Sequence, residues 1–320
     1  MVKNTLSFLF ALALAVPAFA ETPKRIVVFG DSLSDPGNAF ALLGATNTPP
    51  DYSVDPFLVP DRPYARGGQH FSNGATWVEQ LARPLGLAGN ARPALRSASS
   101  NAANYAVGGA RARDDLSNVN LPQQVARFLS DHGGAAPSDA LYIVAIGGND
   151  LRDAVVAFVT AVQSGKTLPE AQLAAQQVIG EAVGAIGTNL QLLAARGAQR
   201  FLVWYVPNVG LTPALRSVGL TALGDGLAQG FNGALEANVL TPLGGAGLGI
   251  QRLDVYTMLN QITANGAAYG LTNTTSACIT PNVAPFFCQQ ADDYLFWDGI
   301  HPTAAGHALI AQQAAAVLGH

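Results

Sequence analysis

The sequence has few cysteines, few charged residues and no excess of positive charge. Of its 320 residues, two are cysteine and 12% are charged, with 17 Lys and Arg against 21 Asp and Glu. The formal net charge is −4, so the chain lacks the excess of basic residues that is typical of nucleic-acid-binding proteins. We therefore expect no nucleic-acid partner.

Long apolar runs are also scarce. The N-terminal run at residues 6–16 is too short for a membrane span, which needs about 18 or more apolar residues. Lys3 precedes this run and Ala18-Phe19-Ala20 follows it, which is the pattern of a secretory signal peptide. We therefore expect residues 1–20 to be a signal peptide cleaved after Ala20, and the protein to be secreted or periplasmic.

No later stretch is expected to cross a membrane, because glycine and proline interrupt the other apolar runs. Residues 21–320 show no internal repeat, and their length fits a single large α/β domain. In an exported protein, Cys278 and Cys288 are expected to form a disulfide, since they lie ten positions apart in one polar stretch. A bridge of this span stabilises a fold by roughly 2–3 kcal/mol.

Short apolar runs alternate with helical patterns along this domain. Five runs predict strands, at residues 26–29, 104–107, 141–146, 200–206 and 251–255. Helical patterns occupy residues 77–82, 122–131, 151–163, 168–196 and 303–318. This alternation predicts an α/β fold with a mainly parallel five-stranded sheet and helices on both faces.

A long segment between the first two predicted strands has a different composition. Residues 39–71 are rich in Pro, Asp, Gly and aromatic residues. A loop of this length in a compact domain is usually functional, so we place it as a flap near the site. Thr76 follows, with Glu79 three residues later, which is the spacing of a helix capping box.

Ser32 is the first candidate for a catalytic residue. It follows the first predicted strand, where open α/β sheets place their ligands. A serine nucleophile needs a base that an acid orients. His301 fits that base, because Asp298 stands three residues before it in a turn and can face one ring nitrogen. A zinc site that adds His307 is less favoured, since no further His or Cys stands at ligand spacing.

Three glycine-containing loops follow neighbouring predicted strands and are expected to converge at one crevice. Hydrolysis of an ester needs donors fixed in advance for the developing oxyanion. The backbone N–H groups of Ser32 and Gly109 and the side-chain amide of Asn149 can supply three. The N–H of Gly108 could replace that of Gly109. We expect Asp31, Asp35, Asn38 and Asp150 to be structural, with Asp150 capping the helix that follows it.

Four separated motifs resemble those of GDSL esterases/lipases of the SGNH hydrolase superfamily. They are Gly30-Asp-Ser-Leu-Ser34, Asn104-Tyr-Ala-Val-Gly-Gly-Ala110, Gly147-Gly-Asn-Asp150 and Asp298-Gly-Ile-His301. The stretch Phe71-Ser-Asn-Gly74, followed by Trp77-Val-Glu-Gln80, also resembles the bacterial secreted branch of this family. The resemblance implies a flavodoxin-like three-layer α/β/α sandwich. It also implies Ser32 as nucleophile, His301 as base, Asp298 as orienting acid, and an oxyanion hole of Ser32, Gly109 and Asn149. Relatives often carry Arg just before Phe71, where this chain has Gln69-His70.

Two other motifs are not supported by their context. The tetrapeptide Ser164-Gly-Lys-Thr167 joins two predicted helices and has Thr160 where a P-loop needs glycine. Ser34 stands where the Gly-x-Ser-x-Gly motif of α/β-hydrolases has its second glycine. We therefore expect neither nucleotide binding nor the nucleophile elbow of α/β-hydrolases, the sharp strand-to-helix turn that carries their serine.

These features predict a secreted serine esterase that hydrolyses carboxylic esters through an acyl-enzyme, with no metal and no cofactor. The aromatic and Pro-rich flap favours acyl esters or lysophospholipids as small-molecule or lipid substrates. Three alternatives stay open. They are an acyltransferase with the same three residues, a short-chain acetyl or choline esterase, and a flavodoxin-like cofactor binder without catalysis.

Overall fold

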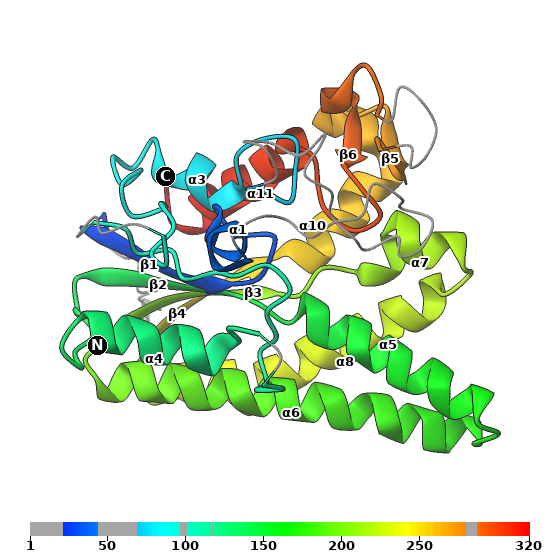
Figure 1. Ribbon diagram of the computed structural model, residues 1–320, viewed down its shortest axis with the longest axis horizontal. Helices are drawn as coiled ribbons and strands as arrows, with labels where there is room; N and C mark the ends of the chain where they lie inside the picture. Colours follow the sequence, from blue (N-terminus) through cyan, green and yellow to red (C-terminus); the bar gives the residue numbers. More distant parts are fainter. Residues whose placement is uncertain (1–21, 44–68, 97–100, 117, 280–286) are drawn as a thin grey trace, which may run out of the picture.

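The computed structural model describes residues 22–43, 69–96, 101–116, 118–279 and 287–320. The signal peptide expected at residues 1–20 and most of the expected flap lie outside the described residues. In the described part, a parallel sheet lies between two layers of helices (Figure 1). This arrangement confirms the predicted α/β/α fold class.

The central sheet contains four strands, all of whose neighbouring pairs are parallel. They are β1 (Arg25–Gly30), β2 (Ala140–Ala145), β3 (Arg200–Tyr205) and β4 (Gly249–Asp254), in that spatial order. All of β2 and the last five residues of β1 are buried. Their sequences do not alternate between apolar and polar residues, because helices cover both faces of the sheet.

The predicted strand at residues 104–107 lies along the outer edge of β1 without forming a regular ladder. The N–H groups of Tyr105 and Val107 donate to the carbonyls of Val28 and Gly30, at 2.8 and 3.1 Å. The segment pairs with β1 through one parallel bridge, between Val28 and Asn104, whose side chain bonds the backbone of Ser34 and Ala106. The five predicted segments therefore stand in the order 2-1-3-4-5, which is flavodoxin-like.

One face of the sheet is covered by long helices. They are α4 (Leu121–Asp131), α5 (Gly148–Gln163), α6 (Leu168–Ala195) and α8 (Thr221–Leu235), the last continued by a π-helical turn η2 (Glu236–Leu240) and α9 (Thr241–Gly245). Side chains from α4, α5, α6 and α8 form one core with Val27 and Phe29 of β1. The predicted helices of this region are therefore present.

The opposite face carries α3 (Trp77–Ala82), α10 (Val255–Ala264) and α11 (Ala304–Val317). They form a second core with Ile26 and Val28 of β1. The predicted capping box is present at α3, since Thr76 accepts from the N–H of Glu79 and the Glu79 carboxylate accepts from the N–H of Thr76.

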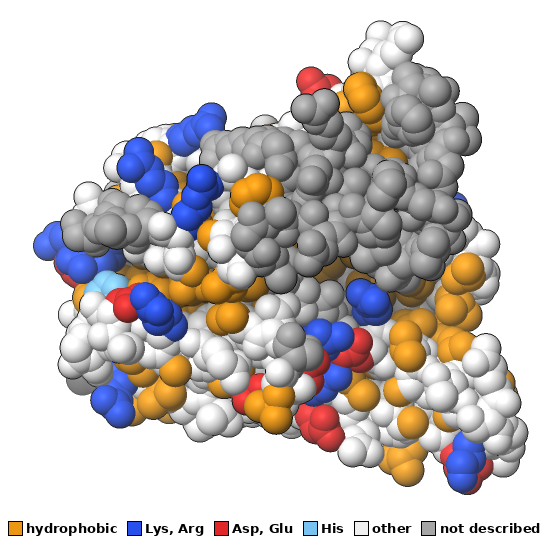
Figure 2. All heavy atoms as spheres, viewed as in Figure 1, with side chains coloured by type: hydrophobic (Ala, Val, Ile, Leu, Met, Phe, Trp, Pro, Cys, Tyr) orange, Lys and Arg blue, Asp and Glu red, His pale blue; other side chains and the backbone are white. Residues whose placement is uncertain are grey.

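Shorter elements surround the carboxyl end of the sheet. They are α1 (Asn38–Leu43), the 3₁₀ turns η1 (Val209–Leu211), η3 (Gly266–Tyr269) and η4 (Ala291–Asp293), α7 (Pro213–Ser217), and a small parallel pair of β5 (Asn273–Ala277) with β6 (Tyr294–Phe296). The predicted disulfide joins Cys278, which follows β5, to Cys288. In the space-filling view, basic side chains are spread over the face in separate groups (Figure 2).

Helix α6 bears on the prediction that no later stretch crosses a membrane. An 18-residue window within its 28 residues has a mean hydropathy of 1.3, so by length and composition alone the helix could span a membrane. Such a test does not contradict the prediction, which stays a prediction. In the structure α6 packs along α5 and α8 on one face of the sheet (Figure 1). A core helix passes the same test, so the finding places no segment in a membrane.

Candidate active site

Ser32, His301 and Asp298 lie in one hydrogen-bonded line beyond the carboxyl end of β1. Nε2 of His301 is 2.9 Å from Oγ of Ser32, and Nδ1 is 2.6 Å from Oδ2 of Asp298. A carboxylate can only accept, so Nδ1 carries the ring proton and Nε2 is left to accept from the serine hydroxyl. The fold thus brings together three side chains that the sequence predicted as a unit.

The turn after β6 orients Asp298. Its Oδ1 accepts from the N–H groups of Ile300 and His301, at 2.8 and 2.6 Å. Because these bonds fix one carboxylate oxygen, the other faces the imidazole of His301. Both side chains are buried, with Asp298 6% and His301 3% exposed. Water therefore has little access to compete for the bond that orients the base.

Phe71 packs against the catalytic candidate His301, with ring centroids 5.4 Å apart. Its ring also closes on Gly108, where an added Cβ would lie 2.1 Å from Cζ of Phe71. Glycine at this position therefore lets the aromatic ring reach the imidazole.

We expect Gly108→Ala to lower kcat/KM for ester hydrolysis by about tenfold or more, because overpacking of this kind costs roughly 1–3 kcal/mol and displaces Phe71 from His301. Steady-state kinetics would measure the change. Gly184→Ala on α6 is the matched control, since a Cβ there meets nothing within 4 Å. Equal kcat/KM values for the two variants would contradict this account of Phe71.

The buried carboxylate of Asp35 links the loop that carries Ser32 to the loop that carries Gly108 and Gly109, here called the glycine loop. Asp35 accepts from the N–H groups of Gly37, Asn38 and Ala39, and also from that of Gly108 at 2.8 Å. Burial raises the pKa of Asp35. These contacts fit the structural role expected for Asp35. They also occupy the N–H of Gly108, which removes it as an oxyanion donor.

Gly109 and Asn149 remain as the donors beside Ser32. The N–H of Gly109 has no partner among the described residues, and its φ of +78° is in the left-handed region that favours glycine. Asn149 is the second residue of α5, and one N–H of its amide donates to the carbonyl of Ala110 at 2.9 Å. Its second N–H is left for a ligand. The positive end of the α5 dipole adds to the stabilisation of an anion here.

An open cavity of about 70 Å³ borders these groups. Its polar side includes Ser32, Asn149 and His301. The apolar part of the wall is formed by Leu33, Pro207, Val209, Leu215 and Ile300, and Asp31, Gly148, Arg152 and Thr212 complete the lining. The sequence analysis did not single out the 207–215 segment, although it follows a predicted strand at the end of the sheet where ligands bind. The cavity can accommodate an apolar group next to Ser32.

Asp31 is buried directly beneath this cavity. Its Oδ1 accepts from the N–H of Leu33 at 3.1 Å, as in a local turn, while Oδ2 has no hydrogen-bond partner among the residues that the structure describes. Burial raises the pKa of Asp31 to about 7, and the nearby charges of His301 and Asp150 act in opposite directions with smaller effect. Asp31 is expected from the sequence to be structural, but the turn residues around it do not indicate its burial.

Asp31→Asn is expected to weaken the pH dependence of stability. An unfolded aspartate titrates near pH 4, so between about pH 4 and 7 the folded protein binds more protons than the unfolded chain. The free energy of unfolding therefore falls as the pH rises through that window. Asparagine keeps the acceptor for Leu33 but cannot ionise. Urea unfolding at pH 4.5 and 7.5 should show that the free energy of unfolding falls less with pH in the variant than in the wild type. An equal fall in both proteins would contradict a raised pKa at Asp31.

His307 does not join the site. Its Nδ1 accepts from the N–H of Trp77 at 3.3 Å, and burial lowers its pKa to about 3. Within the residues that the structure describes, no group of three or more His, Cys, Asp or Glu side chains could hold a metal ion. The predicted site therefore consists of the serine, histidine and aspartate with the donors beside them.

Comparison with known proteins identifies a family. The profile of the GDSL-like Lipase/Acylhydrolase family matches residues 26–314. Lipase 1 of Photorhabdus luminescens is 25% identical, and the match covers 98% of this chain and 53% of that protein. Esterase EstA of Pseudomonas aeruginosa is 29% identical, with 95% and 48% covered. The chain thus spans about half the length of these two relatives.

A plant relative and a solved structure are also similar. A GDSL esterase/lipase of Arabidopsis thaliana is 26% identical, and the match covers 95% of this chain and 90% of the plant protein. The acetylxylan esterase Axe2 from Geobacillus stearothermophilus is 14% identical, with a TM-score of 0.43 and coverage of 92% and 94%.

Proposed function

Because the chain belongs to the GDSL-like lipase/acylhydrolase family, we propose that it hydrolyses carboxylic esters through an acyl-enzyme on Ser32. The observation that carries this proposal is the line of hydrogen bonds from Ser32 through His301 to Asp298. Purified protein should hydrolyse p-nitrophenyl acyl esters and lose this activity after treatment with a fluorophosphonate. Ester hydrolysis that survives complete labelling of Ser32 would contradict the proposal.

The geometry assigns a role to each group in the first half of the reaction. Oγ of Ser32 attacks the ester carbonyl carbon while Nε2 of His301 takes the hydroxyl proton. Asp298 stabilises the imidazolium that forms. The carbonyl oxygen becomes an oxyanion that accepts from the N–H groups of Ser32 and Gly109 and the amide of Asn149. The carbon–oxygen bond to the alcohol then breaks, and the alcohol leaves with the proton from His301.

Water completes the cycle by the same route. His301 takes a proton from a water molecule, whose oxygen attacks the acyl carbonyl and forms a second oxyanion in the same hole. The bond to Ser32 then breaks and His301 returns the proton to Oγ. The products are a carboxylic acid and an alcohol, with no net change in the enzyme.

We further propose that the substrates carry an acyl chain longer than acetyl. The support is the apolar wall beside Ser32, formed by Pro207, Val209, Leu215 and Ile300. An acyl chain lying there would leave water, which favours binding by about 0.8 kcal/mol for each CH₂ group. The rate on p-nitrophenyl esters should therefore increase from acetate to medium chains. A maximum at acetate would instead favour the acetyl or choline esterase alternative.

Val209→Trp should shorten the preferred acyl chain. Val209 lies in η1 on the cavity wall, and a larger ring there would fill space that the chain uses. We expect kcat/KM for an octanoate ester to fall by about tenfold, which corresponds to the loss of one or two buried CH₂ groups. The kcat/KM for the acetate ester should stay within about twofold of the wild-type value. Parallel losses for both esters would show that the acyl chain lies elsewhere.

We propose that the protein is exported and loses residues 1–20. The support is the apolar N-terminal run with its Ala18-Phe19-Ala20 end, together with the disulfide between Cys278 and Cys288. Intact-mass analysis of protein secreted from cells expressing the full chain should give a mature form that begins at Glu21. Protein that retains Met1 would contradict the proposal.

A further inference from the structure

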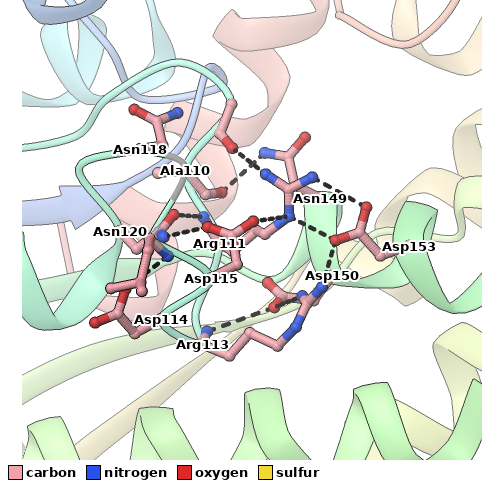
Figure 3. Close-up of polar contacts among 12 residues, drawn as sticks. Ala110, Arg111, Arg113, Asp114, Asp115, Asn118, Asn120, Asn149, Asp150 and Asp153 are labelled. Carbon is pink, nitrogen blue, oxygen red and sulfur yellow. Dashed lines mark hydrogen bonds and ion pairs between the residues drawn. The ribbon is translucent and has the colours of Figure 1, made fainter.

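A network of charged side chains joins the loop that contains Gly108 and Gly109 to the first two turns of α5, behind the oxyanion donors (Figure 3). We call four of its members the clamp: Arg111, Arg113, Asp150 and Asp153. Asp115 also pairs with Arg111, at 3.1 Å, within the loop itself. The two arginines come from the loop that follows Gly109, and the two aspartates come from the helix that carries Asn149. The clamp therefore links the two segments that supply oxyanion donors other than Ser32.

Asp153 receives both guanidinium groups. Arg111 donates through Nε and Nη2 to its two carboxylate oxygens, at 2.5 and 3.1 Å, and Arg113 adds a contact of 2.6 Å from Nη2. Such two-pronged bonds fix both distance and orientation. Burial alone would raise the pKa of Asp153, but the hydrogen bonds from the arginines outweigh it and lower the pKa. The carboxylate is therefore charged and paired at neutral pH.

Asp150 forms the second half of the clamp. The sequence analysis expected it to cap α5, but no side-chain cap bond is present. Its Oδ1 accepts from Nη1 of Arg113 at 3.0 Å, and its Oδ2 accepts from the N–H of Ala112 at 2.8 Å. The side chain is fully buried, and burial raises its pKa. Breaking one partner of a buried pair is costly, so this contact holds the loop firmly on the helix.

Two of the three oxyanion donors adjoin the clamp, Gly109 through a hydrogen bond and Asn149 through the chain. Nη1 of Arg111 donates to the carbonyl of Gly109 at 3.3 Å, which holds the peptide group that directly follows the one carrying the Gly109 N–H. Asn149 adjoins Asp150 in the chain, and its amide donates to the carbonyl of Ala110 at 2.9 Å. The clamp therefore determines how the N–H of Gly109 and the free amide N–H of Asn149 lie relative to each other.

We propose that Arg111, together with Arg113, Asp150 and Asp153, positions the oxyanion hole. This inference rests on the proposed esterase function. The arginines are positioning residues, since they act through Gly109 and Asn149 and line no part of the cavity. A donor that shifts by about 1 Å can lower the rate by up to 100-fold, because oxyanion stabilisation depends on fixed geometry. Loss of the clamp should therefore affect the transition state more than substrate binding.

Arg111→Gln tests the proposal. We expect kcat to fall by about tenfold or more while KM stays within about twofold, which is the sign of a contact that matters only in the transition state. The inhibition constant of butane boronic acid, which forms a tetrahedral adduct on serine, should rise by a similar factor. Arg111→Lys should recover only part of the loss, because lysine keeps the charge but not the fork of donors.

Arg252→Gln is the matched control. Arg252 on β4 makes the same two-pronged pair with Glu236, at 3.0 and 2.9 Å, and neither residue lines the cavity. This variant should have the same kcat and the same inhibition constant for butane boronic acid as the wild type. We expect Arg252→Gln to change only the unfolding midpoint. If Arg111→Gln also changes only the unfolding midpoint, the proposal is wrong.

Two further variants keep the test decisive. If near-ultraviolet circular dichroism shows that Arg111→Gln does not fold, Asp153→Asn replaces it, with the same expected pattern in kcat and KM. An unchanged kcat in a folded Asp153→Asn variant would overturn the proposal. Ser32→Ala distinguishes a failure of the proposed esterase mechanism from a failure of the proposed role of the clamp. An active Ser32→Ala protein would refute the esterase mechanism itself, whereas an inactive one with a normal Arg111→Gln variant would refute the clamp alone.

Discussion

Replacing Ser32 with alanine should lower kcat for ester hydrolysis by a factor on the order of 10⁵, since removal of a serine nucleophile from a triad leaves only binding and oxyanion stabilisation. The hydroxyl of Ser32 contacts His301 and lies at the cavity, so its loss should not disturb the fold. Circular dichroism and thermal unfolding should match the wild type, while p-nitrophenol release falls to near background.

A neighbouring serine provides the control for this result. Ser34 is buried in the same loop, and its hydroxyl accepts from Nε1 of Trp77 at 3.0 Å. Ser34→Ala should lower the unfolding midpoint, because it leaves that indole N–H without its acceptor. Its kcat should stay within about threefold of the wild type. A Ser32→Ala variant with activity similar to that of the Ser34→Ala protein would exclude Ser32 as nucleophile.

Asn149→Ala should lower kcat by about 100- to 1,000-fold, because removal of one oxyanion donor costs roughly 2.7–4 kcal/mol of transition-state stabilisation. KM for the same ester should change little, since the ground-state carbonyl carries less negative charge than the oxyanion. Steady-state kinetics on a p-nitrophenyl ester would separate the two constants.

Asn189→Ala is the control for the loss of an amide side chain. The amide of Asn189 on α6 also donates to a backbone carbonyl, that of Ala185 at 2.8 Å, but it lies outside the cavity. This variant should retain kcat. If Asn149→Ala loses less than about threefold, the amide only anchors the glycine loop through Ala110 and is not an oxyanion donor.

Much of the fold could be predicted from local patterns. The runs that became β1, β2 and β3 are continuously apolar, which requires burial on both faces and hence a parallel sheet. The pairing of Asp298 with His301 was also local, because three residues in a turn suffice to bring the groups together. The contact of His301 with Ser32 spans 269 positions and could be expected only from the sheet topology and the resemblance to a family.

Other features depend on contacts that no local pattern encodes. Arg111 and Arg113 look like ordinary loop charges, and their partners on α5 lie about 40 positions away. The raised pKa of Asp31 results from burial by distant segments, whereas the sequence around it indicates only a turn. The segment at 104–107 has the apolar character of a strand, but it forms an isolated bridge with β1, and the amide of Asn104 reaches the backbone of Ser34, 70 positions away.

The central claim is that Ser32 carries the acyl group during turnover, and trapping that intermediate tests it most directly. A p-nitrophenyl ester would be mixed with the enzyme, quenched in acid within the first turnover, digested and analysed by mass spectrometry. The mechanism predicts the added mass of the acyl group on the peptide that contains Ser32, and no adduct in Ser32→Ala. An acyl group on another residue, or turnover with no adduct at any time, would contradict it.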